Sequence, residues 1–280
     1  ATTEIDTLSL HDALPIWFDV RMAAKPEEVP SGSRCIVAAG RNSALARDAG
    51  AAPANAPEAL AISAGRLGNR PALAAAGADA RGLMYALTDI ADAVALQGNP
   101  EMALPVNGGA VAERPANKIR SVMRMFVSDV EDKAWYYDKD VWRNYLTTLA
   151  AQRFNRFNLA FGLGYDAPTG VRDSYFYFAY PFLLAVPGYE VVASNLSNTE
   201  RDENFAMLRF ISDEAAARGL DFQLGLWTHA YALQNSPEAN HVITGLTPQT
   251  QAPYCRDALA IILKECPNIT GVTFRIHGES

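Results

Sequence analysis

The sequence predicts an α/β protein, in which a small α/β domain is followed by the first half of a (β/α)₈ barrel. Three observations carry this prediction. Beyond residue 117, strand-like and helix-like segments alternate, which is typical of a parallel sheet. Four such units fill the remainder of the chain, half of the number in an eight-stranded barrel. The side chains of the four strands also divide alike, into an apolar face and a face of polar or small residues.

We expect four segments along the chain: 1–16, 17–100, 101–116 and 117–280. The first, ATTEIDTLSLHDALPI, resembles a translated sequencing adapter at every position except Asp6, so we expect no function for His11 or Asp12. It lacks the basic and apolar regions of a signal peptide. The chain stops at Ser280, directly after a strand-like run. The expectation is an open reading frame clipped at both ends, as in a metagenomic contig, with its cellular location left open.

Composition narrows the classes of function. The residues are 49% apolar and 20% charged, which is ordinary for a globular protein. A net charge of −7 argues against a nucleic-acid partner, which would need a basic face. No apolar run approaches the roughly 20 residues of a membrane span. Cys35, Cys255 and Cys266 lack metal-ligand spacing and are expected as buried small hydrophobic residues. We expect no cofactor, and the oligomeric state is left open.

The segment 17–100 reads as a small α/β domain without evident chemistry. Strands are expected at Arg34–Ala39, Glu58–Ala64 and Pro71–Ala76, and a helix from Asp79 to Gly98. The helix stripe expected to be buried is Leu83, Leu87, Ile90 and Val94. Residues 101–116 carry Gly and Pro and are expected as a linker.

The two short strands and the following Gly77-Ala-Asp79-Ala-Arg81-Gly82-Leu-Met-Tyr85-Ala resemble a known domain. It is the zincin-like accessory domain that precedes the barrel in beta-hexosaminidases and alpha-glucuronidases, with Gly77, Gly82 and Tyr85 as the matching positions. The resemblance covers part of the first domain. Because that domain is not catalytic in those families, it implies no catalytic residue here.

In the segment 117–280 the expected elements alternate. Strands are expected at Arg120–Val127, Phe157–Phe161, Phe222–His229 and Gly271–Glu279. Between them, helices are expected at Asp140–Gln152, from Ser197 to Gly219 and from Thr247 onward, with Val141, Tyr145 and Leu149 on one side of the first. Ser197-x-x-Glu200 has the spacing of a capping box.

The face of these strands that would line a barrel interior carries the candidate functional residues. Phe157, Leu159 and Phe161 are expected to face the helices, and Met123 and Met125 likewise. Polar residues gather toward the carboxyl ends of the strands, where barrel enzymes keep their sites, and such a cluster is costly to bury without a purpose. The predicted interior set is Arg124, Asn158, Trp227, His229, Arg275, His277 and Glu279. The alternative is structural: core histidines, buried ion pairs of Arg124 and Arg275, and plain packing of Trp227.

A carboxyl group at the end of the fourth strand suits glycoside hydrolysis, which needs one carboxylic acid and a second, opposing carboxylate. We predict Glu279 as the general acid, with a carbohydrate as substrate and the second carboxylate on a later strand beyond this chain. Trp227 and the aromatic segment 175–180 are expected to stack against sugar, and the two inward arginines favour an acidic sugar. Family-20 hexosaminidases have an Asp-Glu pair where Gly278 and Glu279 stand, and the large retaining clan has Asn before its acid. The resemblance is therefore to an architecture.

Three alternatives to a glycosidase stay open. Gly278-Glu279-Ser280 could begin the G-x-S-x-G elbow of a serine esterase. His229, His277 and Glu279 could ligate a divalent metal in a barrel hydrolase. The protein could also be a non-catalytic sugar-binding homologue.

Overall fold

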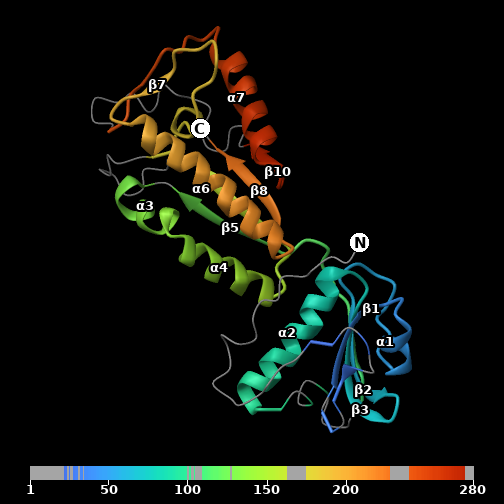
Figure 1. Ribbon diagram of the computed structural model, residues 1–280. Coiled ribbons are helices and arrows are strands. Elements are labelled where there is room, and N and C mark those ends of the chain that lie inside the picture. The colour runs from blue at the N-terminus through green and yellow to red at the C-terminus, as the bar shows by residue number, and fades with distance from the viewer. Residues whose placement is uncertain are drawn as a thin grey trace. The chain divides into compact units, whose positions relative to one another are not determined.

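The computed structural model divides the chain into two compact units between Lys118 and Ile119 (Figure 1). It describes residues 22–23, 25, 28–30, 32–33, 35–99, 101, 104, 109–126, 128–162, 175–227 and 240–274. The predicted α/β class is confirmed: each unit holds a four-stranded sheet with helices. Within these ranges, no helix has the length and hydropathy needed to cross a membrane.

The first unit is a sheet with a helix on each face. Its strands lie in the order β1-β3-β2-β4, with β1 parallel to β3 and the remaining neighbours antiparallel. Ala72, Ala74 and Ala76 of β3 pack with Ala46 of α1 on one face, while Leu73 and Ala75 pack with the second helix on the other. The elements are β1 Cys35–Gly40, α1 Ala44–Asp48, β2 Leu60–Leu67, β3 Arg70–Gly77, α2 Ala80–Gln97 and β4 Val111–Glu113.

Helix α2 begins and ends as its sequence predicts. The Asp79 side chain caps the start by accepting from the Gly82 backbone N–H, and Gly98 ends the helix in the left-handed conformation. The buried stripe differs in part: Ile90 and Val94 are buried, but Leu87 is 37% exposed, because the helix turns Tyr85 and Ala86 to the sheet instead. Strand β4 falls within the stretch expected as a linker.

The three positions that carry the resemblance to the accessory domain have packing roles. A Cβ at Gly82 would lie 2.2 Å from the carbonyl oxygen of Ala59, and one at Gly77 would lie 2.0 Å from the backbone nitrogen of Leu83. Both glycines therefore let the helix start close against the sheet. Tyr85 is buried, and its hydroxyl lies 3.4 Å from Glu58 Oε2.

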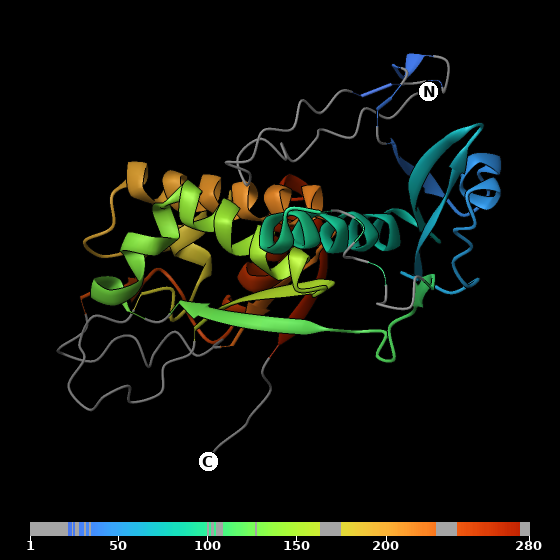
Figure 2. The ribbon, with the colours of Figure 1, turned by 90° about the horizontal axis from the view of Figure 1, so that it is seen from below.

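The second unit is a parallel sheet whose strands follow one another in chain order, β5, β6, β8 and β10. Its helices lie on one face of that sheet (Figure 2). The strands are β5 Ser121–Phe126, β6 Arg156–Phe161, β8 Asp221–Leu226 and β10 Ile269–Phe274, with a ribbon of β7 Val192–Ala193 and β9 Ile243–Thr244. The helices are α3 Asp129–Tyr137, α4 Lys139–Ala151, α5 Tyr180–Leu183, α6 Asn198–Ala217 and α7 Gln251–Glu265.

This order distinguishes the unit from a doubly wound sheet, in which the strand order reverses and helices cover both faces. Parallel strands in sequence with helices on one side are the arrangement of a (β/α)₈ barrel, and four strands are half of one. The predicted fold class is thus confirmed for the second unit as well.

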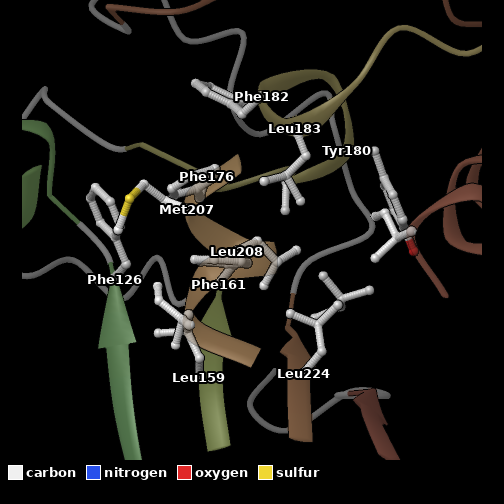
Figure 3. Close-up of a cluster of buried hydrophobic side chains, with 14 of the residues drawn as sticks. Phe126, Leu159, Phe161, Phe176, Tyr180, Phe182, Leu183, Met207, Leu208 and Leu224 are labelled. Carbon is white, nitrogen blue, oxygen red and sulfur yellow. The ribbon is translucent and has the colours of Figure 1, made fainter. Parts of the chain in front are cut away.

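The core of the second unit lies between the sheet and its helices and is rich in aromatic side chains (Figure 3). Phe126, Phe161 and Phe176 are fully buried, and the ring centroids of Phe161 and Phe176 lie 4.3 Å apart. Predicted residues of this face, Phe157 and Leu159, are also fully buried. Aromatic contacts thus join the ends of the strands to the segment that follows β6.

Local structure in this unit departs from the sequence prediction in two places. Helix α3 was not expected; Ser128 caps it by accepting from the Glu131 backbone N–H. In α4 the predicted side is confirmed in part: Leu149 is buried and Tyr145 packs against the core, but Val141 is 38% exposed. Trp142 and Leu146 complete the buried face. The prediction for the cysteines fits Cys35 and Cys266, which are buried, whereas Cys255 is half-buried.

Candidate functional site

The carboxyl ends of the four parallel strands lie at one edge of the second sheet, where barrel enzymes keep their sites. The strand register defines two rows of side chains on the face away from the helices. The row farther from the carboxyl ends is Met123, Asn158, Gln223 and Gly271. The row nearer to them is Met125, Ala160, Gly225 and Thr273.

The first row presents side-chain amides to the interior. Gln223 donates through Nε2 to the hydroxyl of Thr273. Asn158 Oδ1 is buried and has no hydrogen-bond partner among the residues that the structure describes. A buried amide oxygen without a partner is costly, so this atom is an acceptor available to a ligand hydroxyl or to ordered water.

Three members of the second row, Ala160, Gly225 and Thr273, have small side chains, whereas Met125 is larger. A Cβ at Gly225 would lie 2.8 Å from Ala160 Cβ and 3.1 Å from Asn158 Oδ1. Glycine is therefore the residue that keeps the surroundings of Asn158 open. Trp227 stands two residues after Gly225 and is half-buried. Its backbone N–H donates to the Phe161 carbonyl at 3.0 Å, and the alternation of the strand predicts the same side for its ring as for Gly225.

Arg124 does not lie on this face, which corrects the sequence prediction. Its guanidinium carbon lies 4.0 Å from the ring centroid of Trp135 and 5.4 Å from that of Tyr145, on the helix side of the sheet. The register pairs it with the buried Leu159. The phase of β5 is set by Phe126, which is fully buried among the helices and stands two residues after Arg124.

Met123 and Met125 accordingly lie on the interior face, at 41% and 37% exposure, where the sequence analysis had expected the arginine. The prediction took the two methionines as the apolar, helix-facing residues. Val122 and Phe126, in phase with the arginine, were the signal that could have corrected it. Arginine tolerates such a place because its planar guanidinium stacks on aromatic rings.

The aromatic segment is not a sugar-stacking surface. Tyr175, Phe176, Phe178 and Tyr180 are 0–1% exposed and belong to the core between sheet and helices. Tyr175 stacks on Phe126 with ring centroids 5.4 Å apart. For these four residues the prediction was therefore wrong, because their rings pack between the sheet and the helices, whereas Tyr177 is half-buried.

The remaining predicted site residues, His229, Arg275, His277 and Glu279, lie outside the described residues. Of the predicted set, the strand register thus places Asn158 on the interior side, and Arg124 packs on the opposite one. Trp227 follows the end of β8, and we expect it on the interior side from the alternation of that strand. Among the described residues, no group of three or more His, Cys, Asp or Glu side chains could hold a metal ion.

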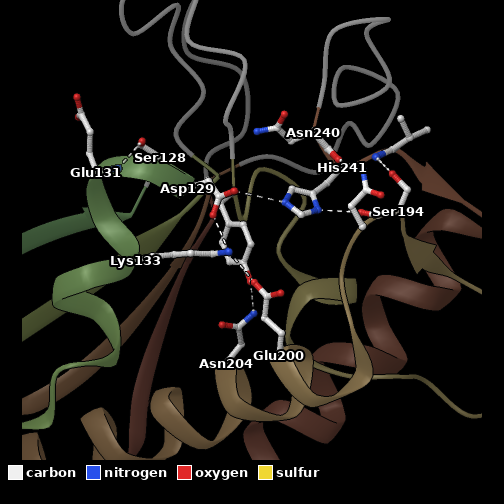
Figure 4. A network of polar contacts seen from close by, with 12 residues as sticks. Ser128, Asp129, Glu131, Lys133, Ser194, Glu200, Asn204, Asn240 and His241 are labelled. Carbon is white, nitrogen blue, oxygen red and sulfur yellow. Dashed lines mark hydrogen bonds and ion pairs between the residues drawn. The ribbon is translucent and has the colours of Figure 1, made fainter.

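A polar network at the same edge was missed by the sequence analysis (Figure 4). Lys133 Nζ lies 2.6 Å from Asp129 Oδ1 and 2.6 Å from Glu200 Oε1. The Tyr175 hydroxyl donates to Glu200 Oε1 at 2.8 Å and accepts from Asn204 Nδ2 at 2.7 Å. The network joins the segments that follow β5 and β6.

These contacts set the charge states of the network. Burial alone would raise the pKa of Glu200, but hydrogen bonds from Lys133 and Tyr175 outweigh it and hold that pKa below its ordinary value. Burial would likewise lower the pKa of Lys133, but its bonds to Asp129 and Glu200 prevail and raise it. Burial raises the pKa of Tyr175 far above its usual range, so this phenol stays neutral.

The only sequence signal for this network was the spacing Ser197-x-x-Glu200. Ser197 Oγ accepts from the Glu200 backbone N–H at 3.1 Å, as a capping box requires. The Glu200 carboxylate, however, is bound to Lys133 and Tyr175, from other parts of the chain.

No protein-family model matches the chain, and no curated protein matches it in sequence. Solved structures do match. A GH138 enzyme targeting pectin rhamnogalacturonan II aligns with a TM-score of 0.55 and 18% identity over 85% of this chain and 26% of its own. The chain has a glycoside-hydrolase-like fold. It spans about a quarter of the length of that enzyme.

Two further matches are weaker. The GH20 beta-N-acetylhexosaminidase from Streptomyces coelicolor A3(2) has a TM-score of 0.42 and 17% identity over 75% of this chain and 43% of its own. CpGH84B has a TM-score of 0.37 and 11% identity over 78% of this chain and 29% of its own.

Proposed function

We propose that this chain carries the first half of the catalytic barrel of a glycoside hydrolase, preceded by an accessory domain that takes no part in the chemistry. The observation that supports it most is the free face of the second sheet. Four parallel strands lie in chain order, and β6, β8 and β10 present amides and small side chains there, beside the methionines of β5, on the side away from the helices. The fold shared with the GH138 enzyme supports the same reaction class.

Within this proposal, Glu279 is the general acid. It stands in the sequence five residues after the end of β10 at Phe274. A general acid must hold its proton near neutral pH, so its carboxyl has to be shielded from water or set beside another carboxylate. We infer that His277 is neutral and holds a substrate hydroxyl, because a charged imidazole nearby would favour the ionised carboxylate. The second carboxylate would come from a later strand.

Trp227 and Asn158 are the substrate-binding residues of the described part of this site. Trp227 offers a ring at the end of β8, and Asn158 offers a buried acceptor below it. Indole rings and amides are suited to the apolar face and the hydroxyl edge of a sugar. His229 would add a hydrogen-bonding group from the segment after Trp227.

The preference for an acidic sugar now rests on Arg275 alone, since Arg124 lies on the helix side. A guanidinium binds a carboxylate through paired hydrogen bonds, which suits a uronic acid. The GH138 enzyme that shares the fold targets pectin rhamnogalacturonan II.

The esterase alternative is disfavoured by the arrangement of the second unit. A nucleophile elbow belongs to the α/β-hydrolase sheet, which carries helices on both faces. In the described residues the helices lie on one face of the sheet, which favours the barrel.

The test is Glu279→Gln in the full-length protein, assayed on aryl uronides and neutral aryl glycosides with poor and with activated leaving groups. Loss of a general acid should lower turnover by about 10²–10⁴-fold on poor leaving groups and far less on activated ones. Glu190→Gln, which changes an exposed glutamate, is the matched control and should leave both rates unchanged.

Two outcomes would contradict the assignment. Equal losses on both kinds of substrate would point to a nucleophile or metal-ligand role for Glu279. If neither rate changed, the cluster at the end of the fourth strand would be structural, and a sugar-binding homologue would be the better description.

A further inference from the structure

Two amide side chains on the face of the second sheet away from the helices lean the same way, each toward the next strand. The strand register places Asn158 of β6 beside Gln223 of β8, and Gln223 beside Gly271 of β10. Each amide reaches diagonally to the residue two positions farther along that neighbouring strand. For Gln223 this residue is Thr273, and for Asn158 it is Gly225.

The two amides differ in what they find at that diagonal position. Nε2 of Gln223 donates to the hydroxyl of Thr273. Asn158 Oδ1 lies 3.1 Å from the point that a Cβ of Gly225 would occupy, but a glycine has no side chain to offer. This oxygen is buried and has no hydrogen-bond partner among the described residues. One hydroxyl group is therefore present beside the first amide and missing beside the second.

The chemistry of the surroundings selects the group that could take the missing place. An amide oxygen accepts hydrogen bonds, so the group must carry a donor, and a carboxylate does not fit. The two rows of side chains on this face contain amides, methionines and small residues but no charged residue. An ammonium group would therefore be buried there without a counter-charge, which is costly. A neutral donor remains, and hydroxyl groups are the neutral donors that every sugar carries.

We propose that Asn158 and Gly225 form a notch that takes one hydroxyl group of the sugar, which makes Asn158 a specificity-determining residue. The inference deepens the proposed function and rests on it for the word sugar. The hydroxyl takes the place beside Asn158 that the hydroxyl of Thr273 takes beside Gln223. The Asn158 carboxamide turns about its Cβ–Cγ bond, a torsion with broad preferences, so that its oxygen meets the ligand.

The notch discriminates between closely related sugars. A deoxy sugar lacks the donor for Asn158 Oδ1, and an O-methyl sugar has lost the proton and carries an added methyl group. That methyl group has little room, because even a Cβ on Gly225 would lie 2.8 Å from Ala160 Cβ. The carboxylate of an acidic sugar binds elsewhere in the site, since an amide oxygen repels it.

A serine at position 225 tests for the missing hydroxyl without any ligand. Gly225→Ala and Gly225→Ser add the same Cβ, which crowds Ala160 equally, but only the serine supplies a hydroxyl beside Asn158 Oδ1. In the full-length protein we expect Gly225→Ser to melt about 2–4 °C above Gly225→Ala, the shift that one hydrogen bond produces in a domain of about 150–250 residues. In an Asn158→Ala background the two glycine variants should melt at the same temperature.

Two results of this comparison would overturn the notch. One is an equal melting temperature for Gly225→Ser and Gly225→Ala, which would show that Asn158 lacks nothing that a hydroxyl supplies. The other is a difference that persists in the Asn158→Ala background, which would show that the serine acts on another group.

Deoxy analogues test the same notch with substrate and leave the crowded glycine unchanged. The probes are the aryl glycoside that the full-length enzyme hydrolyses best, its monodeoxy analogues and its O-methyl analogues. Removal of one particular hydroxyl should lower kcat/KM about tenfold, and methylation of the same hydroxyl at least as much. In Asn158→Ala the deoxy loss should shrink to about twofold or less, whereas the control Glu190→Gln, at an exposed position, should retain it.

The outcomes separate this inference from the proposed function. If no monodeoxy loss depends on Asn158, ordered water alone satisfies its oxygen and the notch is refuted. If the unchanged protein hydrolysed no glycoside, the proposed function would fail. The melting temperatures of the Gly225 variants would then still decide whether a hydroxyl group is missing beside Asn158.

Discussion

The two four-stranded sheets of this chain differ in what covers them. In the first, α1 and α2 occupy opposite faces, and alternate residues of β3 are buried on both sides. In the second, the helices occupy one face, and the other carries Met123 and Met125, more than a third exposed. The first sheet thus has both faces packed, whereas the second leaves one face uncovered within the described residues, and the candidate site lies on that face.

The two cores are also built from different side chains. Alanines line much of the first, so that its sheet and helices approach closely and depend on glycine where backbones meet. Large aromatic rings fill the second, among them Phe126, Phe161 and Trp142. The stability of the first unit should therefore be most sensitive to substitutions that add atoms to its core. The stability of the second should be most sensitive to substitutions that remove them.

Removal of a ring from the aromatic core should have the largest effect on stability. Phe161 is fully buried and contacts Phe126, Tyr136 and Phe176. Phe161→Ala should lower the free energy of unfolding by about 3–5 kcal/mol, because it leaves a cavity. Urea denaturation followed by tryptophan fluorescence measures this, and Phe161→Leu should cost clearly less. Equal costs would show that the ring is not what fills this core.

Addition of one methyl group should be most damaging in the first unit. Gly82→Ala would place Cβ 2.2 Å from the Ala59 carbonyl oxygen, a backbone atom that cannot turn away. We expect a loss of about 1–3 kcal/mol from overpacking, measured by thermal melting. Gly98→Ala is the control: it meets nothing within 4 Å, and only its φ of +68° is strained, which costs about 1 kcal/mol. A milder effect of Gly82→Ala than of Gly98→Ala would refute the close approach.

The same change on the open face should affect binding more than folding. Gly225→Ala would crowd Ala160 and approach Asn158 Oδ1 at 3.1 Å. In the full-length enzyme we expect KM for the glycoside to rise about tenfold, the effect of one misplaced methyl group in a binding pocket. Gly82→Ala should leave KM unchanged. An unaltered KM for Gly225→Ala would remove Asn158 and its surroundings from the proposed sugar site.

The smallest effect is expected at the polar network. Because Lys133 and Tyr175 hold the pKa of Glu200 below its ordinary value, ionised Glu200 stabilises the fold above the ordinary carboxyl range, and this is lost as pH falls through the lowered pKa. Glu200→Gln should therefore make stability fall less steeply with acidification, by less than about 1 kcal/mol, because solvent still screens this half-buried pair. The control Glu190→Gln should leave the dependence of stability on pH unchanged. The midpoints of urea denaturation of the two variants and the unchanged protein, measured between pH 3 and pH 7, test this prediction.

Much of the fold could be predicted from local pattern. Period-two alternation located the strands around Phe157 and Phe222, and Asp79 and Gly98 fixed the bounds of α2, since capping depends on neighbouring residues only. The strict alternation of strands and helices after residue 117 was enough to predict a parallel sheet, because parallel strands need a crossover between them.

Which face a residue occupies was harder to predict than which element holds it. Arg124 is of a residue type common in binding sites. Phe126, two positions later, fixes the phase of β5, however, so that the arginine packs on Trp135 and Tyr145. The segment from Tyr175 to Tyr180 looked like a binding surface because aromatic residues suit both sugars and cores. Whether a ring meets solvent or helices depends on the path of the chain.

The sequence by itself determined the α/β class, the order of the main strands and helices, and the amides and small residues that β6 and β8 present on one face, because these follow from periodicity and capping. Only the tertiary structure decided which of those residues meet. Lys133, Glu200 and His241 are far apart in the chain, and Asp129 joins them because three loops converge at one edge of the sheet. Convergence of this kind is set by packing across the whole unit, which no local pattern records.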